Sequence, residues 1–366
     1  MTEPSSHSRR TRIAVVTGAS AGIGRATAVA FAEAGFDVAL LARGRAGLDA
    51  AAAEVRAKGR RALAISTDVA DEEQVFAAAQ QVEDELGEID VWVNDAMTTA
   101  FAPTWDIAPD DFRRAVDVTF LGQVWGTLAA LKYMRARDRG TIINIGSALA
   151  FIGIPLQSAY CASKFACRGF VESIRAELLH EGSHVRMGMV HMPAVNTPQF
   201  TWCLTTMHRH PQPVPPIYEP EKVAQYVVRS AVEGRRSKIV GSWNHLVVAA
   251  GQFTPGFGNH YAALGAWESQ LTGQPIRAGR PVNLHEPADE DTDAGARGIF
   301  SHKAGGFLDP SFLRSLPTTA VTFARAAGAY GQEKVALWRR SEQPARLARS
   351  MAATASALRG AGSRSR

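Results

Sequence analysis

The chain has 366 residues, of which 46% are hydrophobic and 20% charged, the composition of a globular protein with a buried core. Its net charge of +5 arises from basic side chains in residues 1–12 and 331–366, so the body lacks a basic groove and no nucleic-acid partner is expected. Three cysteines without metal or redox spacing, no apolar run long enough to span a membrane and no secretion signal favour a cytoplasmic protein.

From residue 12 to residue 242, short apolar runs alternate with segments of helical patterning. The runs typical of strands are residues 12–18, 36–43, 61–67, 89–94, 140–146, 184–190 and 238–242, and those typical of helices are residues 23–35, 46–59, 71–87, 109–136, 155–180 and 220–233. The strands are continuously apolar, as strands buried on both faces are. This alternation predicts βαβ units, and therefore an α/β fold with helices on both faces of a parallel sheet.

Regular patterning ends near residue 242. Residues 250–310 are rich in Gly, Pro and Asn and include the acidic stretch HEPADEDTDAG. The expected parts of the chain are a disordered leader (1–11), an α/β domain (12–245) that contains the motifs described below, an irregular C-terminal extension (246–330) and a basic, flexible tail (331–366). Trp243 and Trp267 are expected to pin the extension to the core.

Two interpretations apply to the tail. Leu347, Met351 and Leu358 recur at helical spacing beside two arginines, which is compatible with contact to an anionic membrane surface. Pro344 limits the length of such a helix, and Gly, Ser and Ala surround it, so a solvated tail is the favoured interpretation.

The stretch TGASAGIG links the first expected strand to the first expected helix. A dinucleotide needs such a turn, because the backbone must approach the pyrophosphate closely and the helix N-terminus supplies free N–H groups. The residues predicted to contact the cofactor here are Thr17, Gly18, Ser20, Gly22, Ile23 and Gly24. A plain turn is the alternative, but its position at the start of the βαβ series favours nucleotide binding.

The end of the second expected strand selects between the two nicotinamide cofactors. An acid there pairs with the free 2′-hydroxyl of NAD, whereas an arginine pairs with the 2′-phosphate of NADP. The strand ends in LLARGR without an acid. Arg43 can bind a phosphate through the parallel N–H groups of its planar guanidinium, and Arg45 is a weaker candidate. We therefore expect NADP rather than NAD. The alternative is that Arg43 only caps the strand in solvent.

Asp68 ends the third expected strand in TDVAD, where a carboxylate can accept a hydrogen bond from the adenine amino group. Val69 beside it is assigned to the same cofactor site. The alternative for Asp68 is an N-cap role, which either Asp68 or Asp71 could take before the helical segment EEQVF.

Ser147, Tyr160 and Lys164 stand in an otherwise apolar stretch. Tyr160 and Lys164 are at positions i and i+4 of one expected helix and share a face. Ser147 ends the preceding strand, at the edge where open α/β sheets bind ligands. A tyrosine is a weak acid near neutrality, and an adjacent ammonium lowers its pKa. The three side chains are therefore predicted to move a proton at a substrate oxygen while a hydride moves at carbon.

These motifs resemble the short-chain dehydrogenase/reductase family in its compact single-domain form. The resemblance covers residues 12–245 and rests on TGASAGIG, TDVAD, VNDA, GTIINIGS, YCASK and MPAVNTP. It implies a Rossmann-type fold, a doubly wound parallel sheet of about seven strands. It also implies NAD(P)-dependent interconversion of alcohols and carbonyls.

By that resemblance, Ser147 binds the substrate oxygen, Tyr160 is the general acid/base, and Lys164 lowers the pKa of Tyr160 and bonds the nicotinamide ribose. The cofactor contacts implied outside the glycine turn are Asn94, Tyr160, Lys164, Pro193, Val195 and Thr197. Of these, Asn94 supports the sheet near the cofactor, and Thr197 contacts the nicotinamide carboxamide.

The sequence departs from the family pattern at three places. Asp95 and Met97 stand in NDAM where the family reads Asn-Asn-Ala-Gly, and Ala194 replaces the glycine of a Pro-Gly pair. Where the family's helix carries an Asn that completes a proton relay, this chain has Thr119. A Thr hydroxyl could hold a water with different geometry, so Thr119 is expected to serve a working but less efficient relay.

Apolar side chains flank the predicted site. The loop that follows Thr197 contains Phe200, Trp202, Leu204 and Met207. With residues 151–156 beside Ser147, they favour a small apolar carbonyl or alcohol as substrate. The alternative is that these side chains pack beneath the C-terminal extension. His208 and His210 have no further ligand cluster in the sequence, so no metal site is expected.

We therefore expect an NADP-dependent oxidoreductase that interconverts a carbonyl and an alcohol. The rival interpretation is a non-catalytic protein that binds NADPH or a partner and retains the fold, but such a protein has no need of a low-pKa tyrosine. An epimerase or dehydratase is less favoured, because those usually have another glycine spacing and a C-terminal substrate domain. The resemblance also implies a homo-oligomer, formed through the helices that begin near residues 109 and 155.

Overall fold

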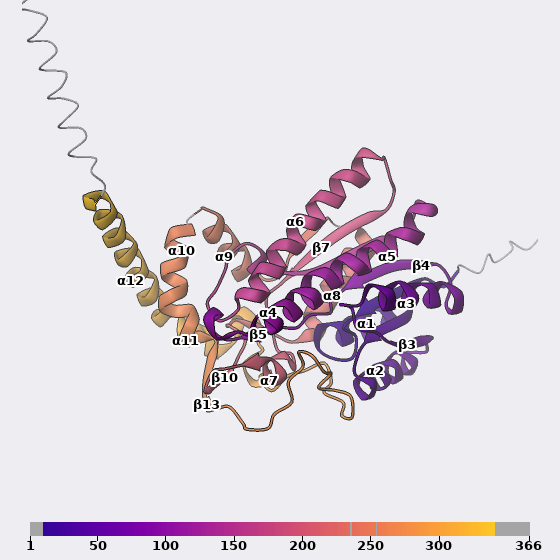
Figure 1. Cartoon of the computed structure of the whole chain (residues 1–366), viewed down its shortest axis with the longest axis horizontal. Coiled ribbons are helices and arrows are strands. Elements are labelled where there is room, and N and C mark those ends of the chain that lie inside the picture. Colours follow the sequence, from indigo (N-terminus) through magenta and orange to yellow (C-terminus); the bar gives the residue numbers. More distant parts are fainter. Residues whose placement is uncertain (1–9, 235, 254, 341–366) are drawn as a thin grey trace, which may run out of the picture.

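A parallel β-sheet forms the centre of the protein (Figure 1). The computed structural model describes residues 10–234, 236–253 and 255–340. The seven-stranded sheet has the order β3-β2-β1-β4-β6-β7-β12, and all neighbouring strands are parallel. Its strands are β1 Ile13–Thr17, β2 Asp37–Ala42, β3 Ala62–Ser66, β4 Ile89–Asn94, β6 Thr141–Ser147, β7 Arg186–Met192 and β12 Ser237–Ile239. The predicted doubly wound Rossmann-type fold is confirmed.

Helices cover both faces of this sheet. One face carries α1 Gly22–Glu33, α2 Arg45–Ala57 and α8 Pro220–Glu233, and the other carries α3 Glu72–Glu85, α4 Pro109–Val116, α5 Gly122–Ala136 and α6 Ser158–His180. Alternate residues of each central strand enter different layers: in β1, Val16 packs into the first core cluster and Val15 into the second. Both faces of each strand are therefore buried, which explains the continuously apolar runs.

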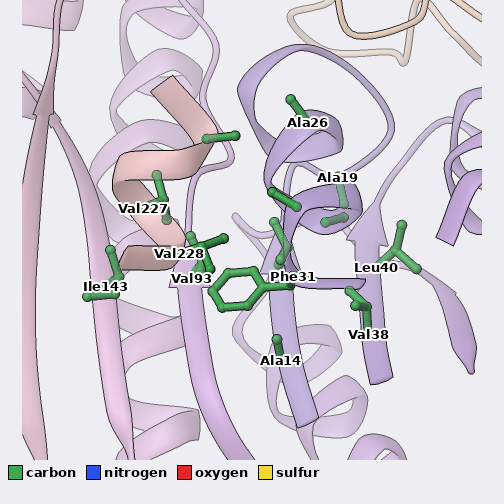
Figure 2. Close-up of a cluster of buried hydrophobic side chains, with 14 of the residues drawn as sticks. Ala14, Ala19, Ala26, Phe31, Val38, Leu40, Val93, Ile143, Val227 and Val228 are labelled. Carbon is green, nitrogen blue, oxygen red and sulfur yellow. The ribbon is translucent and has the colours of Figure 1, made fainter. Parts of the chain in front are cut away.

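The first core cluster fixes α1 against the sheet. Phe31 is fully buried and lies between α8 and the strand side chains, as Figure 2 shows. Its ring meets the edge of Phe36 at a centroid distance of 5.1 Å. Burial of one such side chain stabilises the fold by about 1.5–3 kcal/mol. Because α1 is held in this way, its N-terminus and the preceding turn stay at the carboxyl edge of β1.

Short strands and one short helix build the loops beyond the sheet. The pairs are β5 Ala100–Phe101 with β9 Leu204–Thr205, β8 Ala194–Val195 with β11 Ile217–Tyr218, and β10 Arg209–Pro211 with β13 Leu271–Pro275, and the helix is α7 Gln199–Trp202. Because β13 belongs to the C-terminal extension, its pairing with β10 ties the extension to the loop after β7.

The C-terminal extension combines helices with one irregular segment. Its helices are α9 Ser242–Phe253, α10 Pro255–Tyr261, α11 Trp267–Ser269 and α12 Pro310–Arg340. Between β13 and α12, residues 276–309 contain only short 3₁₀ turns and run along one edge of the molecule toward α2, drawn in orange in Figure 1. No helix in the described part of the chain is long and apolar enough to cross a membrane.

Two tryptophans were expected to attach the extension to the core. Trp267 packs against a cluster that joins Phe101 and Leu156 of the domain with Leu271 of the extension. Trp243, near the end of the domain, meets Phe312 of α12 in the extension at a centroid distance of 5.5 Å. α12 crosses residue 331, where the sequence pattern places the start of the tail. The leader residues 1–9 and the tail residues 341–366, with the possible membrane helix, lie outside the described residues, and the domain division stays a prediction.

Candidate active site

The turn between β1 and α1 requires glycine at three positions. Gly18 and Gly22 have φ angles of +68° and +60°, which side chains other than glycine rarely adopt. A Cβ on Gly24 would lie 2.2 Å from the carbonyl oxygen of Gly18, so α1 starts directly against the turn. Thr17 Oγ1 accepts hydrogen bonds from the N–H groups of Asp95 and of the next residue, at 3.0 and 3.1 Å. A cradle of this kind at a helix N-terminus fits the pyrophosphate of a dinucleotide.

The segment after β7 lies beside this turn. Pro193 separates β7 from β8, and Val195 of β8 pairs with Tyr218 of β11. A Cβ on Gly22 would lie 3.4 Å from the side chain of Thr197. The structure therefore places Thr197 next to the glycine turn, on the path that a cofactor running from β2 to the catalytic residues would take.

Two of the predicted cofactor residues have apolar side chains that face the core. Ile23 is partly buried against the first core cluster, and Val69 is buried in the second. A Cβ on Gly122 of α5 would lie 2.6 Å from Val69, which shows how closely that helix approaches. Polar contact with a nucleotide would therefore come from the main-chain groups of these two residues.

Ser147, Tyr160 and Lys164 meet at the carboxyl edge of the sheet. Ser147 is the last residue of β6, and its hydroxyl accepts from the N–H of Leu149 at 3.1 Å. It is also close enough to Tyr160 to lower the pKa of that phenol. Tyr160 and Lys164 project from α6, with Lys164 Nζ 5.6 Å from the centre of the Tyr160 ring. Lys164 is almost completely buried, and its Nζ donates to the carbonyl oxygen of Ile145 at 2.7 Å.

The proton affinity of Tyr160 differs from the sequence-based expectation. We expected Lys164 to lower the pKa of this tyrosine, but burial raises the pKa of Tyr160 well above its usual range, and the hydrogen bond with Ser147 offsets only part of the effect. Burial also lowers the pKa of Lys164, whose hydrogen bond goes to Ile145. Tyr160 therefore keeps its proton at neutral pH.

Asp95 is a buried acid that the sequence analysis treated only as a departure from the family pattern. It is 9% exposed and accepts a hydrogen bond from the N–H of Gly24. Burial raises the pKa of Asp95 to about 7, although the positive charge of Lys164 and the bond from Gly24 oppose this shift. The structure thus adds a titratable group between the glycine turn and Lys164. The Asp in NDAM was the only sequence signal for it.

Thr119 lies in a π-helical turn, Asp117–Leu121, between α4 and α5. Its Oγ1 donates to the carbonyl oxygen of Thr98 at 2.7 Å and accepts from the N–H of the same residue at 3.1 Å. The side chain is completely buried. We expected this hydroxyl to hold a water of a proton relay, but in the structure it donates its single proton to the carbonyl oxygen of Thr98. Thr119 instead ties the helix bend to the segment after β4.

Asn94 is committed to the central sheet. Its Nδ2 donates to the main-chain oxygen of Gln123 and to the side chains of Thr127 and Asn144, at 3.3, 3.0 and 3.0 Å. Its Oδ1 accepts from Trp92 Nε1 at 2.7 Å. This network holds β4 against α5 and β6, which is the supporting role that the family resemblance implies. A direct contact between Asn94 and the cofactor stays a prediction.

Asp68 and Asp71 take different roles after β3. Asp71 is the N-cap of α3 and accepts from the N–H of Gln74 at 3.1 Å. The carboxylate of Asp68 accepts from the N–H of Ala70 and pairs with Arg114 of α4 at 2.5 Å. The N-cap alternative therefore belongs to Asp71. The adenine contact of Asp68 stays a prediction, and the Arg114 pairing is a feature that the sequence did not indicate.

Arg43 does not point freely into solvent. Its Nη1 donates to the carbonyl oxygens of Leu284 and His285 at 3.1 and 2.7 Å, and its Nη2 donates to Asn283 Oδ1 at 3.1 Å. Burial lowers the pKa of Arg43. The alternative in which this arginine only caps β2 in solvent does not describe the side chain, because the C-terminal extension supplies all of these acceptors.

Most side chains of the predicted substrate loop pack against the C-terminal extension. Phe200 meets Phe300 at a centroid distance of 6.3 Å. Met207 packs against a cluster that includes Leu271 of the extension, and Leu204 packs against one that includes Leu284. The alternative interpretation, in which these residues lie beneath the extension, therefore describes them. Phe151 and Ile152, which follow Ser147, are partly exposed, and a Cβ on Gly258 of α10 would lie 3.5 Å from Ile152.

The histidines near this loop form no metal site in the structure. His210 Nδ1 lies 2.7 Å from the carbonyl oxygen of Pro211. His191 of β7 is buried beside Ser147, and burial lowers its pKa to about 4, so the ring is neutral. Within residues 10–340, leaving out 235 and 254, no three His, Cys, Asp or Glu side chains gather as metal ligands would.

Comparisons with known proteins agree with this site. The sequence profile of the short chain dehydrogenase family matches residues 12–204. The chain is 34% identical over 246 residues to the uncharacterized oxidoreductase YxnA of Bacillus subtilis (strain 168), covering 67% of this chain and 69% of that protein. It is 31% identical over 243 residues to a 3-dehydrosphinganine reductase of Danio rerio, covering 64% and 73%. The chain belongs to the short-chain dehydrogenase/reductase family.

A solved structure of the same family shares the fold. A metagenomic short-chain oxidoreductase in complex with NADP matches with a TM-score of 0.53 and 28% identity, over 63% of this chain and 95% of that one. Together with the family profile and the glycine turn, this match shows that the protein is an oxidoreductase with a nicotinamide cofactor and a small-molecule substrate.

Proposed function

We propose that this protein interconverts an apolar carbonyl compound and its alcohol, with NADP(H) as hydride carrier. The observation that carries the proposal is the meeting of Ser147, Tyr160 and Lys164 at the carboxyl edge of the sheet. The glycine turn and Thr197 lie along the same edge, so a dinucleotide held by the turn can reach the catalytic residues.

In the reductive direction, the bound cofactor supplies the hydride that adds to the carbonyl carbon. Tyr160 donates its phenolic proton to the carbonyl oxygen, so the products are an alcohol and a tyrosinate. The raised pKa of Tyr160 suits this role, because the phenol is protonated before reaction. The hydroxyl of Ser147, already within hydrogen-bonding reach of Tyr160, orients the substrate oxygen. The charge of Lys164 on the same helix face stabilises the tyrosinate.

NADP is proposed in preference to NAD for two reasons. Arg43 directly follows β2, and the carboxyl end of this strand has no acid that could pair with a free 2′-hydroxyl. The solved relative was complexed with NADP. Arg43 would exchange its carbonyl partners in the extension for the 2′-phosphate.

The apolar character of the substrate is supported by what surrounds Ser147. Phe151 and Ile152 are partly exposed beside it, and α10 of the extension approaches Ile152. Such a lining favours a hydrocarbon-bearing ketone or alcohol over a sugar. One relative is a 3-dehydrosphinganine reductase, which agrees with this substrate class.

The experiment compares the wild-type protein with Tyr160→Phe. NADPH oxidation is followed with a panel of apolar ketones, and NADPH binding is followed by fluorescence titration. Loss of the proton donor is expected to lower kcat by about 10²–10⁴-fold, with unchanged NADPH affinity. Tyr226→Phe, on α8 at the opposite face of the sheet, is the matched control and keeps full activity. Equal turnover by Tyr160→Phe and wild type would refute the proposed mechanism.

A further inference from the structure

Residues 283–298 of the extension, here called the strap, lie along the whole predicted cofactor path. The strap begins beside β4, where Thr98 Oγ1 donates to the carbonyl oxygen of Asn283 at 2.8 Å. It then meets Arg43 at the end of β2 and continues to the glycine turn, where the N–H of Gly22 donates to Gly295 at 3.2 Å. It ends beside Thr197, because a Cβ on Gly298 would lie 2.4 Å from the carbonyl oxygen of that residue.

Strap oxygens also occupy the N-terminus of α2. The N–H of Ala46 donates to the carbonyl oxygen of Glu290 at 3.0 Å, and that of Gly47 donates to Asp289 at 3.2 Å. The N–H of Arg45 donates to the Glu290 carboxylate at 3.1 Å. The free amides of a helix N-terminus attract anions, and here the acidic strap supplies the acceptors. Arg43, just before this helix, donates to four more strap acceptors.

Asp289 is a buried strap residue whose carboxylate keeps an unpaired oxygen in the described part of the chain. It is 3% exposed, and its Oδ2 has no hydrogen-bond partner among the described residues. A Cβ on Gly44 would lie 1.9 Å from its Oδ1, and a Cβ on Gly47 would lie 2.6 Å from its Oδ2 and 3.1 Å from Ser20. The carboxylate is thus wedged between α2 and the glycine turn. A buried carboxylate oxygen without a donor is unfavourable unless a ligand supplies one.

We propose that Asp289 is a specificity-determining residue of the cofactor site, which lowers the affinity for NADP(H) relative to NAD(H). The inference rests on the proposed function, because it requires a nicotinamide cofactor on this path. The Asp289 carboxylate interacts electrostatically with Arg43. A 2′-phosphate bound by Arg43 would therefore bring a second negative charge, with acceptor oxygens only, close to this carboxylate. A free 2′-hydroxyl can instead donate to Oδ2 and give that oxygen its missing partner.

Two side chains then act in opposite directions on the affinity for the 2′-phosphate of the cofactor. Arg43 attracts the 2′-phosphate, but it has to release strap carbonyls to bind it. Asp289 opposes the same phosphate and supplies, from the C-terminal extension, the acid that is missing at the carboxyl end of β2. The ratio of NADPH to NADH affinity therefore depends on a residue outside the segment that the family profile matches.

The test is a binding experiment with the full-length protein. Dissociation constants for NADPH and NADH are measured by fluorescence titration for wild type, Asp289→Asn and Asp289→Ala. Both variants remove the charge, and far-UV circular dichroism verifies that each is folded. We expect the NADPH:NADH affinity ratio to rise about tenfold in both, because NADPH binds more tightly and NADH does not. Asp291→Asn, an exposed strap residue, is the matched control and keeps the wild-type ratio.

The possible failures are distinguishable. An unchanged or lower ratio in a folded Asp289 variant overturns the role of Asp289 and leaves the proposed function standing. A ratio that rises equally in Asp291→Asn shows a general effect of strap charge and also overturns it. If folded wild type and variants bind neither nucleotide, the proposed function fails, and the inference fails with it.

Discussion

Asp95 is a carboxyl group whose ionisation opposes folding. Its pKa is about 7 in the folded protein, against 3.8 for an exposed aspartate, because burial disfavours its charge. Between these two values the folded state binds more protons than the unfolded state does. Stability therefore falls as the pH rises from about 4 to about 7, by at most about 1.4 kcal/mol per pH unit for this group.

Asp95→Asn removes this ionisation without changing the shape of the side chain. We expect the variant to be more stable than wild type by about 1–3 kcal/mol at pH 8 and to differ little at pH 4. Urea unfolding at both pH values measures the difference. Asp49 is an exposed residue of α2, and Asp49→Asn is the control, which leaves the free energy of unfolding unchanged at both pH values. The same pH dependence in wild type and Asp95→Asn would contradict the buried-acid assignment.

Single residues show how far the sequence could predict the site. Ser147, Tyr160 and Lys164 were placed correctly next to one another because strand ends and helix faces follow from local patterns. The hydrogen bonds of Thr119 and Arg43 were not predicted, because their partners, Thr98 and residues 283–285, come from other elements. The pKa of a side chain depends on the same distant packing, and no local pattern reports it.

At the scale of elements, the contact between the strap and α2 depends on the small size of Gly44. Its φ of −69° is accessible to any residue, so no backbone strain calls for glycine. A Cβ, however, would lie 1.9 Å from the Asp289 carboxylate and 2.9 Å from its main-chain carbon. Both the side chain and the backbone of the strap would have to move, and α2 itself would not.

Gly44→Ala is therefore expected to detach the strap while it leaves the domain folded. Hydrogen–deuterium exchange of peptides from residues 283–298 should increase several-fold, with unchanged exchange in the central strands. Gly169→Ala is the matched control, because this α6 glycine has open space around it and alanine favours the helix by about 0.5–1 kcal/mol. Unaltered strap exchange in Gly44→Ala would show that the strap does not depend on this contact.

Elements differed in how well their sequences predicted them. The central sheet strands were found because they are largely apolar runs between turns, whereas the short edge strand β12 contains only one apolar residue, Ile239. The helices of the extension were expected as irregular chain, because glycine and proline interrupt their patterns. In the structure α10 and α12 support one another, for example through Phe257 and Phe323 at a centroid distance of 4.6 Å. Such pairing stabilises helices that the local sequence favours weakly.

At the scale of the whole molecule, the two long helices on one face of the sheet expose apolar side chains. Leu128 of α5 and Phe165 and Leu179 of α6 are 37%, 45% and 60% exposed. These are the helices through which the family resemblance implies assembly. We expect a homodimer on this face, with a light-scattering mass twice that of one chain at micromolar concentration.

Phe165→Glu places a charge in that face and is expected to give monomers. Val232→Glu, at an equally exposed position of α8 on the other face, keeps the wild-type mass. Wild-type protein that is monomeric at micromolar concentration, or a dimer insensitive to Phe165→Glu, would contradict this mode of assembly.

The contacts between the strap and the predicted cofactor site can form only late in the synthesis of the chain. α1 and α2 lie within the first 57 residues, yet their nucleotide-facing groups bond to residues 283–298. Ribosomes add about 5–20 residues per second, and N-terminal parts fold first. For about 10–50 seconds a nascent chain therefore displays Arg43 and the amides of α2 to water. A fragment ended at residue 245 would lack every strap acceptor that Arg43 and the N-terminus of α2 bond in the full chain.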